Sequence, residues 1–180
     1  MALRPLYEKY GAEEYYKAFG DQYENPHEEQ VRALIKQNSH RFDPTAVLDF
    51  AAGGGEVSLA LLELGYQNIQ GADPFTHELY RQKTQMPCAT WSFEDIVKEP
   101  KTSETFSCII CSFAMHLCPQ NLLFSLSWNL LQMAPQLLIV TPHKRPALEQ
   151  FEGIQLEWED AVLTEKGKQV RLKSYVLSNS

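Results

Sequence analysis

The chain has 180 residues, of which 16 are basic and 23 acidic, so its formal net charge is −7. A chain of this length predicts a single domain, residues 1–180, whose core forms without disulfide or metal staples. Apolar residues make up 44% and aromatic residues 11%, which excludes a disordered chain. The acidic excess disfavours binding to a phosphate backbone, because the sequence has no basic stripe that could release counterions.

No segment of the sequence predicts a leader or a membrane span. The opening residues, MALRPLYEKYGAEEYY, contain no apolar run long enough for a signal peptide. Nowhere do about 18 uncharged apolar residues follow one another. We therefore expect a soluble, cytoplasmic protein with no membrane partner.

Two of the cysteines have a spacing that also occurs in zinc and redox sites, Cys108-x-x-Cys111. Both lie in FSCIICSF, an apolar run typical of a buried strand, in which residues three apart point to opposite faces. We therefore expect reduced cysteines in the core and no metal site. The other two cysteines are Cys88 and Cys118.

Residues 1–44 are acidic and rich in tyrosine, and their pattern predicts a helical cap. The cap divides into two helical pieces, Glu13 to Phe19 and Pro26 to Ile35. Asn25 followed by Pro26 predicts an N-cap and a first helical residue for the second piece.

From residue 45 to 140, short apolar runs alternate with helical stretches. The strand-like runs are AVLDF, NIQGAD, CATWSF, FSCIICSF and QLLIVT, and the helical ones include EVSLALLEL, HELYRQK and NLLFSLSWNLLQM. Apolar strands separated by helices predict a doubly wound α/β fold with a parallel sheet and helices on both faces. In 141–180, a rim loop precedes two runs of alternating residues, IQLEWEDAVL and QVRLKSYVL, around the turn TEKGK. These runs predict a terminal β-hairpin, antiparallel to the sheet or at its edge.

The run AVLDFAAGGGEVSLALLEL reads as a strand, a glycine-rich turn and a helix. Gly53 and Gly55 let the backbone approach a ligand, and the helix that follows offers unpaired N–H groups at its start. Such a turn alone is also compatible with a nicotinamide-dependent oxidoreductase.

Two carboxylates near this turn restrict the class of ligand that it could bind. Asp49, four residues before Gly53 and expected inside the turn, suits a ligand with an amino or sulfonium charge. Asp73 ends the second strand, 18 positions after Gly55, where it can accept hydrogen bonds from both hydroxyls of a ribose. Together they indicate a cationic nucleoside.

In order along residues 45–180, these motifs resemble those of the class I S-adenosylmethionine-dependent methyltransferases. VLDFAAGGG is similar to the first motif, with Ala51 in place of its first glycine, and GADP resembles the end of the second strand. TWSFEDI and CSFAMHLCP resemble the segments after the third and fourth strands. The resemblance implies a mostly parallel, seven-stranded sheet with an antiparallel strand in the C-terminal hairpin. It also implies S-adenosylmethionine as cofactor and S-adenosylhomocysteine as product.

The same resemblance implies which residues bind the cofactor. Ser92 and the backbone of Phe93 would receive the adenine, although aspartate is commoner in the family at the position of Ser92. Residues 112–114 would lie beside the methionine portion. The complete implied set is Asp49, Ala51, Gly53, Gly55, Asp73, Pro74, Ser92, Phe93, Ser112, Phe113 and Ala114.

Candidate general bases are His116 and His143, which follow the fourth and fifth strands and would reach the pocket rim. In the cap, Tyr16, Tyr23 and His27 are candidates to close over cofactor or substrate, because aromatic faces suit a sulfonium. The alternative for each histidine is a loop residue without a catalytic role, and for the tyrosines simple helix packing.

The loop after the fourth strand reads CSFA, not the Asp/Asn-Pro-Pro-Tyr tetrad of enzymes that methylate exocyclic amines, which disfavours nucleic-acid substrates. HKRP at 143–146 is either a small basic cluster that meets an acidic substrate or an ordinary solvated loop. We expect a methyltransferase with a small-molecule acceptor, monomeric or homodimeric. The alternatives are a catalytically silent cofactor-binding subunit that needs a partner chain, a nucleic-acid or protein methyltransferase, and a nicotinamide-dependent oxidoreductase.

Overall fold

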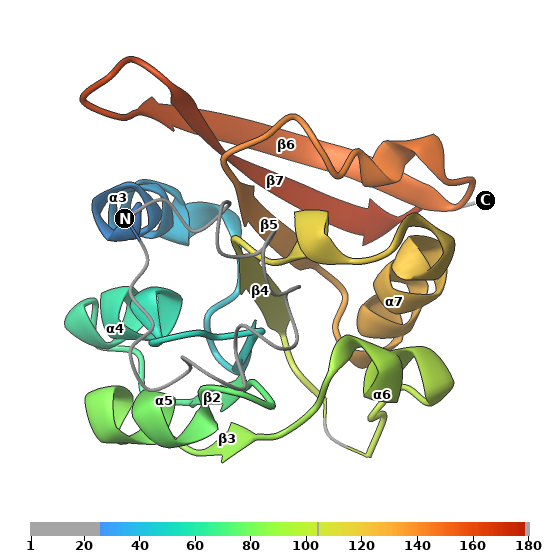
Figure 1. Ribbon diagram of the computed structural model, residues 1–180, viewed down its shortest axis with the longest axis horizontal. Helices are drawn as coiled ribbons and strands as arrows, with labels where there is room; N and C mark the ends of the chain where they lie inside the picture. Colours follow the sequence, from blue (N-terminus) through green and yellow to red (C-terminus); the bar gives the residue numbers. More distant parts are fainter. Residues whose placement is uncertain (1–25, 104, 179–180) are drawn as a thin grey trace, which may run out of the picture.

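The structure, a computed structural model, describes residues 26–103 and 105–178. One seven-stranded sheet, in the order β3-β2-β1-β4-β5-β7-β6, lies between two layers of helices. Figure 1 shows α3, α4 and α5 on one face of the sheet and α6 and α7 on the other. The predicted doubly wound α/β fold with seven strands is confirmed.

Five strands run parallel and bring their carboxyl ends to one edge of the sheet, which we call the carboxyl edge. In the register of the central strand β1, Phe50 lies opposite Ala72 of β2 and Cys111 of β4. The loops that follow these three strands therefore emerge side by side. The parallel strands are β1 (Val47–Phe50), β2 (Ile69–Ala72), β3 (Cys88–Ala89), β4 (Cys108–Ser112) and β5 (Leu137–Thr141).

The helices follow the predicted alternation with the strands. One face of the sheet is covered by α3 (Glu28–Asn38), α4 (Glu56–Glu63) and α5 (His77–Thr84), and the other by α6 (Phe93–Lys98) and α7 (Gln120–Met133). Short 3-10 turns are η2 (Ser39–Arg41), η3 (Met115–Leu117) and η4 (Leu148–Gln150).

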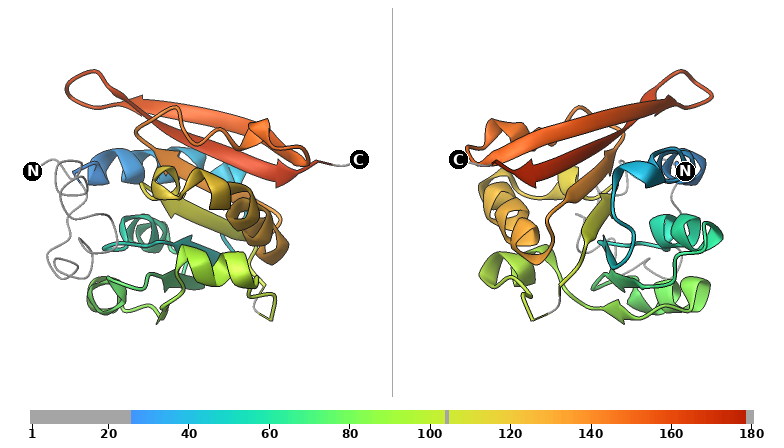
Figure 2. Two further views of the ribbon diagram at one scale, coloured as in Figure 1. Left: turned by 45° about the vertical axis from the view of Figure 1, so that its right-hand side comes forward. Right: turned by 180° about the vertical axis from the view of Figure 1, so that it is seen from behind.

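The chain closes the sheet with the predicted hairpin, β6 (Ile154–Leu163) and β7 (Gln169–Leu177). β7 lies between β5 and β6 and is antiparallel to both. Gly167 has a φ of +79° in the connecting turn, a conformation that favours glycine. Figure 2 shows the hairpin passing over α3, where Asn38 Nδ2 donates to Asp160 Oδ2 at 2.9 Å.

The two faces of β4 belong to two apolar cores. Cys108 and Ile110 pack with the side of the sheet that α3 and α4 cover, whereas Ile109 and Cys111 pack with the side that α7 covers. All four cysteines are free and buried, so the prediction of core cysteines on opposite strand faces is confirmed. Among the described residues, no helix is both long and apolar enough to cross a membrane.

Two predicted element bounds are wrong. The helix expected from Pro26 begins at Glu28, because the backbone carbonyl of His27 accepts the first helical bond, from Val31 N at 3.0 Å. The third strand, expected over CATWSF, spans only Cys88–Ala89, because Ser92 caps a helix. The helical piece Glu13 to Phe19, with Tyr16, and also Tyr23 lie outside the described residues.

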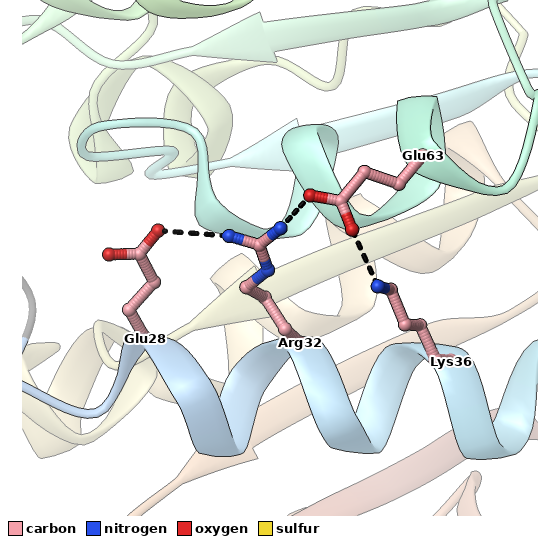
Figure 3. Close-up of polar contacts among 4 residues, drawn as sticks. All are labelled: Glu28, Arg32, Lys36 and Glu63. Atoms are coloured by element: carbon pink, nitrogen blue, oxygen red, sulfur yellow. Dashed lines mark hydrogen bonds and ion pairs between the residues drawn. The ribbon is translucent and has the colours of Figure 1, made fainter.

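Ion pairs join α3 to α4 (Figure 3). Arg32 and Lys36 of α3 both contact the carboxylate of Glu63 on α4, Lys36 at 2.5 Å, and Arg32 also pairs with Glu28 at 3.5 Å. Exposed pairs of this kind contribute up to about 1 kcal/mol each, so the apolar side of α3 provides most of its anchoring. The pairs orient α3, whose preceding turn carries His27 to the carboxyl edge.

Candidate functional site

A cavity of about 620 Å³ opens at the carboxyl edge, between the ends of β1, β2 and β4 and the start of α6. This volume lies in the range of small-molecule sites, and open α/β sheets bind ligands outside the carboxyl ends of their strands. Most of the predicted cofactor residues line it: Ala51, Asp73, Pro74, Ser92, Phe93, Ser112, Phe113 and Ala114.

Asp73 ties two loops of the site together. Its Oδ2 accepts from the backbone N of Gly53 at 3.1 Å, and its Oδ1 accepts from the backbone N of Phe75 at 2.8 Å and of Thr76 at 3.0 Å. A carboxylate offers about four lone-pair sites, so Oδ2 retains capacity for roughly one ligand hydroxyl. The sequence predicts that Asp73 accepts from both hydroxyls of a ribose, whereas the hydrogen bonds within the protein leave about one acceptor site for a ligand.

Asp49 lies in strand β1, not in the turn, and does not line the cavity, so its predicted place is wrong. Alternate residues of a strand face opposite sides, and the neighbouring Phe50 takes the cavity side. Asp49 Oδ2 accepts from Ser58 of α4, from N at 3.2 Å and Oγ at 2.7 Å. Its side chain is 0% exposed, and this burial raises the pKa of the carboxyl well above its usual value. Asp49 therefore anchors the first turn of α4, the helix that follows the glycine-rich turn.

Gly53 and Gly55, also predicted to contact the cofactor, do not line the cavity. The backbone of Gly53 instead makes two hydrogen bonds within the protein. Its N donates to Asp73, and its carbonyl accepts from Thr76 Oγ1 at 2.8 Å. Gly55 has a φ of +85°, and a Cβ there would lie 2.5 Å from Thr84 Cγ2 of α5. The glycines therefore shape the turn and pack it against its neighbours.

Ser92 is occupied by the helix it starts. Its Oγ accepts from Asp95 N at 3.1 Å, and Asp95 Oδ2 accepts from Ser92 N at 2.9 Å, a reciprocal capping box. These bonds hold the pKa of Asp95 below its usual value. Phe93 lines the cavity and is the first residue of α6, so its backbone N–H has no intrahelical acceptor. The predicted backbone contact at Phe93 is thus better placed than the one at Ser92 Oγ.

The aromatic walls of the cavity were missed from the sequence. The rings of Phe50 and Phe93 lie 5.9 Å apart, and Trp91 and Phe75 extend this surface. These residues are next to predicted motif positions, so the rule that strand ends bind ligands could have found them. The full set that was missed is Phe50, Phe75, Thr90, Trp91, Glu94, Asp95, Leu117 and Pro119.

Two residues of the cavity wall have strained backbones. Ala51 and Phe113 have φ values of +53° and +56°, in the left-handed region that costs a residue with a side chain roughly 1–2 kcal/mol. They follow the neighbouring strands β1 and β4, and Phe113 N donates to Val140 O of β5 at 2.8 Å. Strain of this kind gathers at functional sites.

Three histidines meet beside the cavity. The His27 ring stacks on Phe113 at 5.0 Å with an interplanar angle of 13°, and the rings of His116 and His143 meet edge to face at 5.1 Å. Phe113 also lines the cavity, so the His27 ring packs against a residue of the cavity wall. The structure thus brings together the candidate bases and the one described candidate of the cap.

The pKa values of both partly buried histidines are lowered, which favours their neutral form at neutral pH. Burial, followed by the charges of His143 and Arg145, lowers the pKa of His116 to about 4. Burial, Lys168 and His143 also lower the pKa of His27. His116 Nδ1 is buried and, among the described residues, has no hydrogen-bond partner.

Side chains of the sheet anchor the loop that follows β5. Lys173, which is 5% exposed on β7, donates from Nζ to the carbonyls of Lys144 at 2.6 Å and Pro146 at 3.3 Å. Thr141 Oγ1 donates to the carbonyl of Arg145 at 2.9 Å. The backbone of this loop is therefore fixed by bonds that leave its basic side chains in solvent.

The fold is that of the class I S-adenosylmethionine-dependent methyltransferases. Magnesium protoporphyrin IX methyltransferase from Synechocystis PCC 6803, solved with S-adenosylmethionine, superposes with a TM-score of 0.66 at 16% identity, over 98% of this chain and 95% of that one. N-methyltransferase NodS from Bradyrhizobium japonicum, solved with S-adenosylhomocysteine, gives 0.64 at 12% identity, over 87% and 90%. The predicted methyltransferase fold is confirmed.

The chain belongs to the same family as an uncharacterized protein of Schizosaccharomyces pombe. The two are 33% identical over an alignment of 183 positions, which covers 77% of this chain and 74% of the yeast protein. No protein-family model matches the chain.

Proposed function

We propose that this protein transfers a methyl group from S-adenosylmethionine to a small-molecule acceptor. The observation that carries the proposal is one cavity at the carboxyl edge that combines the Asp73 carboxylate with an aromatic surface. Two of the similar structures were solved with S-adenosylmethionine or S-adenosylhomocysteine, which supports this choice of cofactor.

The residues of the cavity fit this cofactor. The remaining lone pair of Asp73 suits a ribose hydroxyl, and the N–H of Phe93 suits a ring nitrogen of adenine. Aromatic faces and the carboxylate of Glu94 favour a ligand with a planar ring and a positive charge. When bound, the cofactor supplies a methyl group on a positively charged sulfur, which leaves as a neutral thioether and keeps the electron pair of the broken bond.

Within this scheme, the protein aligns the acceptor and takes its proton. The acceptor heteroatom forms the new bond to the methyl carbon, and the proton that it loses passes to the imidazole of His116, whose neighbour Leu117 lines the cavity. With its pKa near 4, His116 is neutral at physiological pH and able to accept. His143, exposed and in edge contact with His116, relays the proton to solvent. In an acceptor that needs no deprotonation, alignment alone provides the catalysis.

Calorimetric titration with S-adenosylmethionine, S-adenosylhomocysteine and NAD tests the cofactor. We expect binding of the first two and none of NAD. Binding of NAD alone would refute the methyltransferase proposal and favour an oxidoreductase. Transfer of a labelled methyl group is then assayed over a panel of small metabolites, and cofactor binding without transfer to any of them would favour a silent subunit. Sedimentation of the same sample tests the proposed monomeric or homodimeric state.

A further inference from the structure

The charges around the site are divided into two zones. The cavity itself is lined by the carboxylates of Asp73, Glu94 and Asp95. Beside it, the groups around the histidine cluster are basic, because the side chains that act on His27 and His116 are Lys168, Arg145 and His143. An acidic cavity and a basic rim suit two ligands of opposite charge.

The basic zone is built from three separated parts of the chain. His27 comes from the turn before α3, His116 from η3 after β4, and His143 and Arg145 from the loop after β5, while Lys168 lies at the hairpin turn. In each view of Figures 1 and 2, the hairpin turn and α3 lie on the same side of the molecule. We refer to these five residues as the basic rim.

The basic rim is preorganised. The Lys173 ammonium and the Thr141 hydroxyl hold the carbonyls of the loop after β5, so the backbone under Arg145 is fixed while its guanidinium is exposed. The ring contact with Phe113 places His27 against the wall of the cavity. A group bound on the rim would therefore lie next to the place where the methyl group is delivered.

We propose that the basic rim binds an oxyanion of the methyl acceptor, a carboxylate or a phosphate. This inference rests on the proposed function, because it names the substrate class of the same site. Arginine pairs with such groups through two parallel hydrogen bonds, and an imidazole has at least one N–H donor in either protonation state. Since the protein has a net charge of −7, a local basic patch also directs an anion to this one face.

An anion bound on the basic rim would also raise the pKa of His116 and so make it a stronger base. Burial and cationic neighbours depress the pKa of His116, and a bound negative charge opposes the effect of those neighbours. The pKa then moves toward the working pH, where a general base is most effective. The acceptor would thus activate the group that deprotonates it.

The inference is tested by following the histidine ring protons by NMR while sodium phosphate or sodium acetate replaces chloride at constant pH and ionic strength. Signals are assigned with single His→Gln variants. We expect saturable shifts at His116 and His143, and pH titrations in chloride and in the added anion should show a raised pKa of His116. Stronger binding of phosphate indicates a phosphorylated acceptor, and stronger binding of acetate indicates a carboxylate. Tetramethylammonium, a cation, should give no shift.

Variants locate the anion. Arg145→Gln and Lys168→Gln, each at an exposed position, should weaken phosphate binding about fivefold or more. Lys166→Gln is the matched control, because it removes the same charge from the same turn, and its affinity should stay within about twofold. Absence of saturable shifts, equal losses in Lys166→Gln, or equal shifts with tetramethylammonium would overturn the proposal.

Calorimetry with S-adenosylhomocysteine on the same samples separates the two proposals. Retained binding of S-adenosylhomocysteine with no response to phosphate or acetate refutes the basic rim alone. Failure of the wild-type protein to bind S-adenosylhomocysteine refutes the proposed function, whatever the histidines show.

Discussion

Asp73 accepts a hydrogen bond of 3.1 Å from the amide of Gly53, so a residue at the end of β2 fixes the turn that follows β1. The same carboxylate accepts two further amides and lines the cavity. The geometry of the glycine-rich turn and the ligand surface therefore depend on one side chain.

Replacing Asp73 by alanine should weaken S-adenosylhomocysteine binding about tenfold or more, measured by calorimetry. Unfolding in urea should also show a loss of stability, because buried amides left without an acceptor cost roughly 1–3 kcal/mol each. The control is Asp43→Ala, since Asp43 also accepts a backbone amide, that of Thr45 at 3.0 Å, but does not line the cavity. Unchanged affinity in Asp73→Ala would remove Asp73 from the ligand site.

Glu56, the first residue of α4, should make the protein less stable as the pH rises. Burial raises its pKa in the folded protein to about 7, from 4.5. Between these values the folded state binds the proton and the unfolded state does not, so the free energy of unfolding falls with rising pH, by about 3 kcal/mol in total. Below pH 4.5 both states are protonated and this effect ends.

Glu56→Gln should therefore raise the free energy of unfolding at pH 8 relative to the wild type and change it little at pH 5, measured in urea. Glu29→Gln, at an exposed position of α3, serves as control and should act equally at both pH values. A variant Glu56→Gln whose effect is the same at pH 5 and pH 8 contradicts the assigned burial of this carboxylate.

Gly55→Ala should destabilise the fold by more than the cost of placing a residue with a side chain at a positive φ. The new Cβ would lie 2.5 Å from Thr84 Cγ2, whereas a Cβ at Gly65, which also has a positive φ, meets nothing within 4 Å. Gly65→Ala should cost only about 1–2 kcal/mol, and Gly55→Ala more, because overpacking adds about 1–3 kcal/mol. Adding Thr84→Ser, which removes that methyl group and keeps the hydroxyl, should restore part of the loss. Equal melting temperatures for the two alanine variants would contradict this packing.

Once an acceptor is known, His116→Gln should lower kcat roughly 100- to 10,000-fold if that acceptor needs deprotonation. Binding of S-adenosylhomocysteine should persist, because His116 does not line the cavity. Since its pKa in the free enzyme is about 4, kcat/KM should show no loss from this group between pH 6 and pH 8. His40→Gln, an exposed site on η2, is the control. Full activity in His116→Gln would leave alignment as the sole contribution of the protein.

Local patterns predicted the strands, the glycine-rich turn and the hairpin, because each depends on a few neighbouring residues. The same patterns misplaced Asp49, since a strand buried on both faces shows no polar alternation that marks where it ends. The family resemblance implied an adenine contact at Ser92 and could not show that the Ser92 hydroxyl accepts from Asp95 N once α6 forms.

The histidine cluster shows the limit of sequence reasoning. The predicted order of strands placed His116 and His143 at one edge of the sheet. The stack of His27 on Phe113 depends on how α3 packs against α4 and β6, which no short motif encodes. The strained φ values of Ala51 and Phe113 are likewise set by the surrounding fold.

The anchoring of the loop after β5 by Lys173 has a consequence for the order in which the protein matures during synthesis. Of the residues that the structure describes, those that line the cavity lie from position 50 to position 119, whereas Lys173 emerges 29 residues after Lys144, whose carbonyl it holds. A nascent chain thus carries all the described residues that line the cavity before β7, the strand that anchors the loop after β5, has been synthesised.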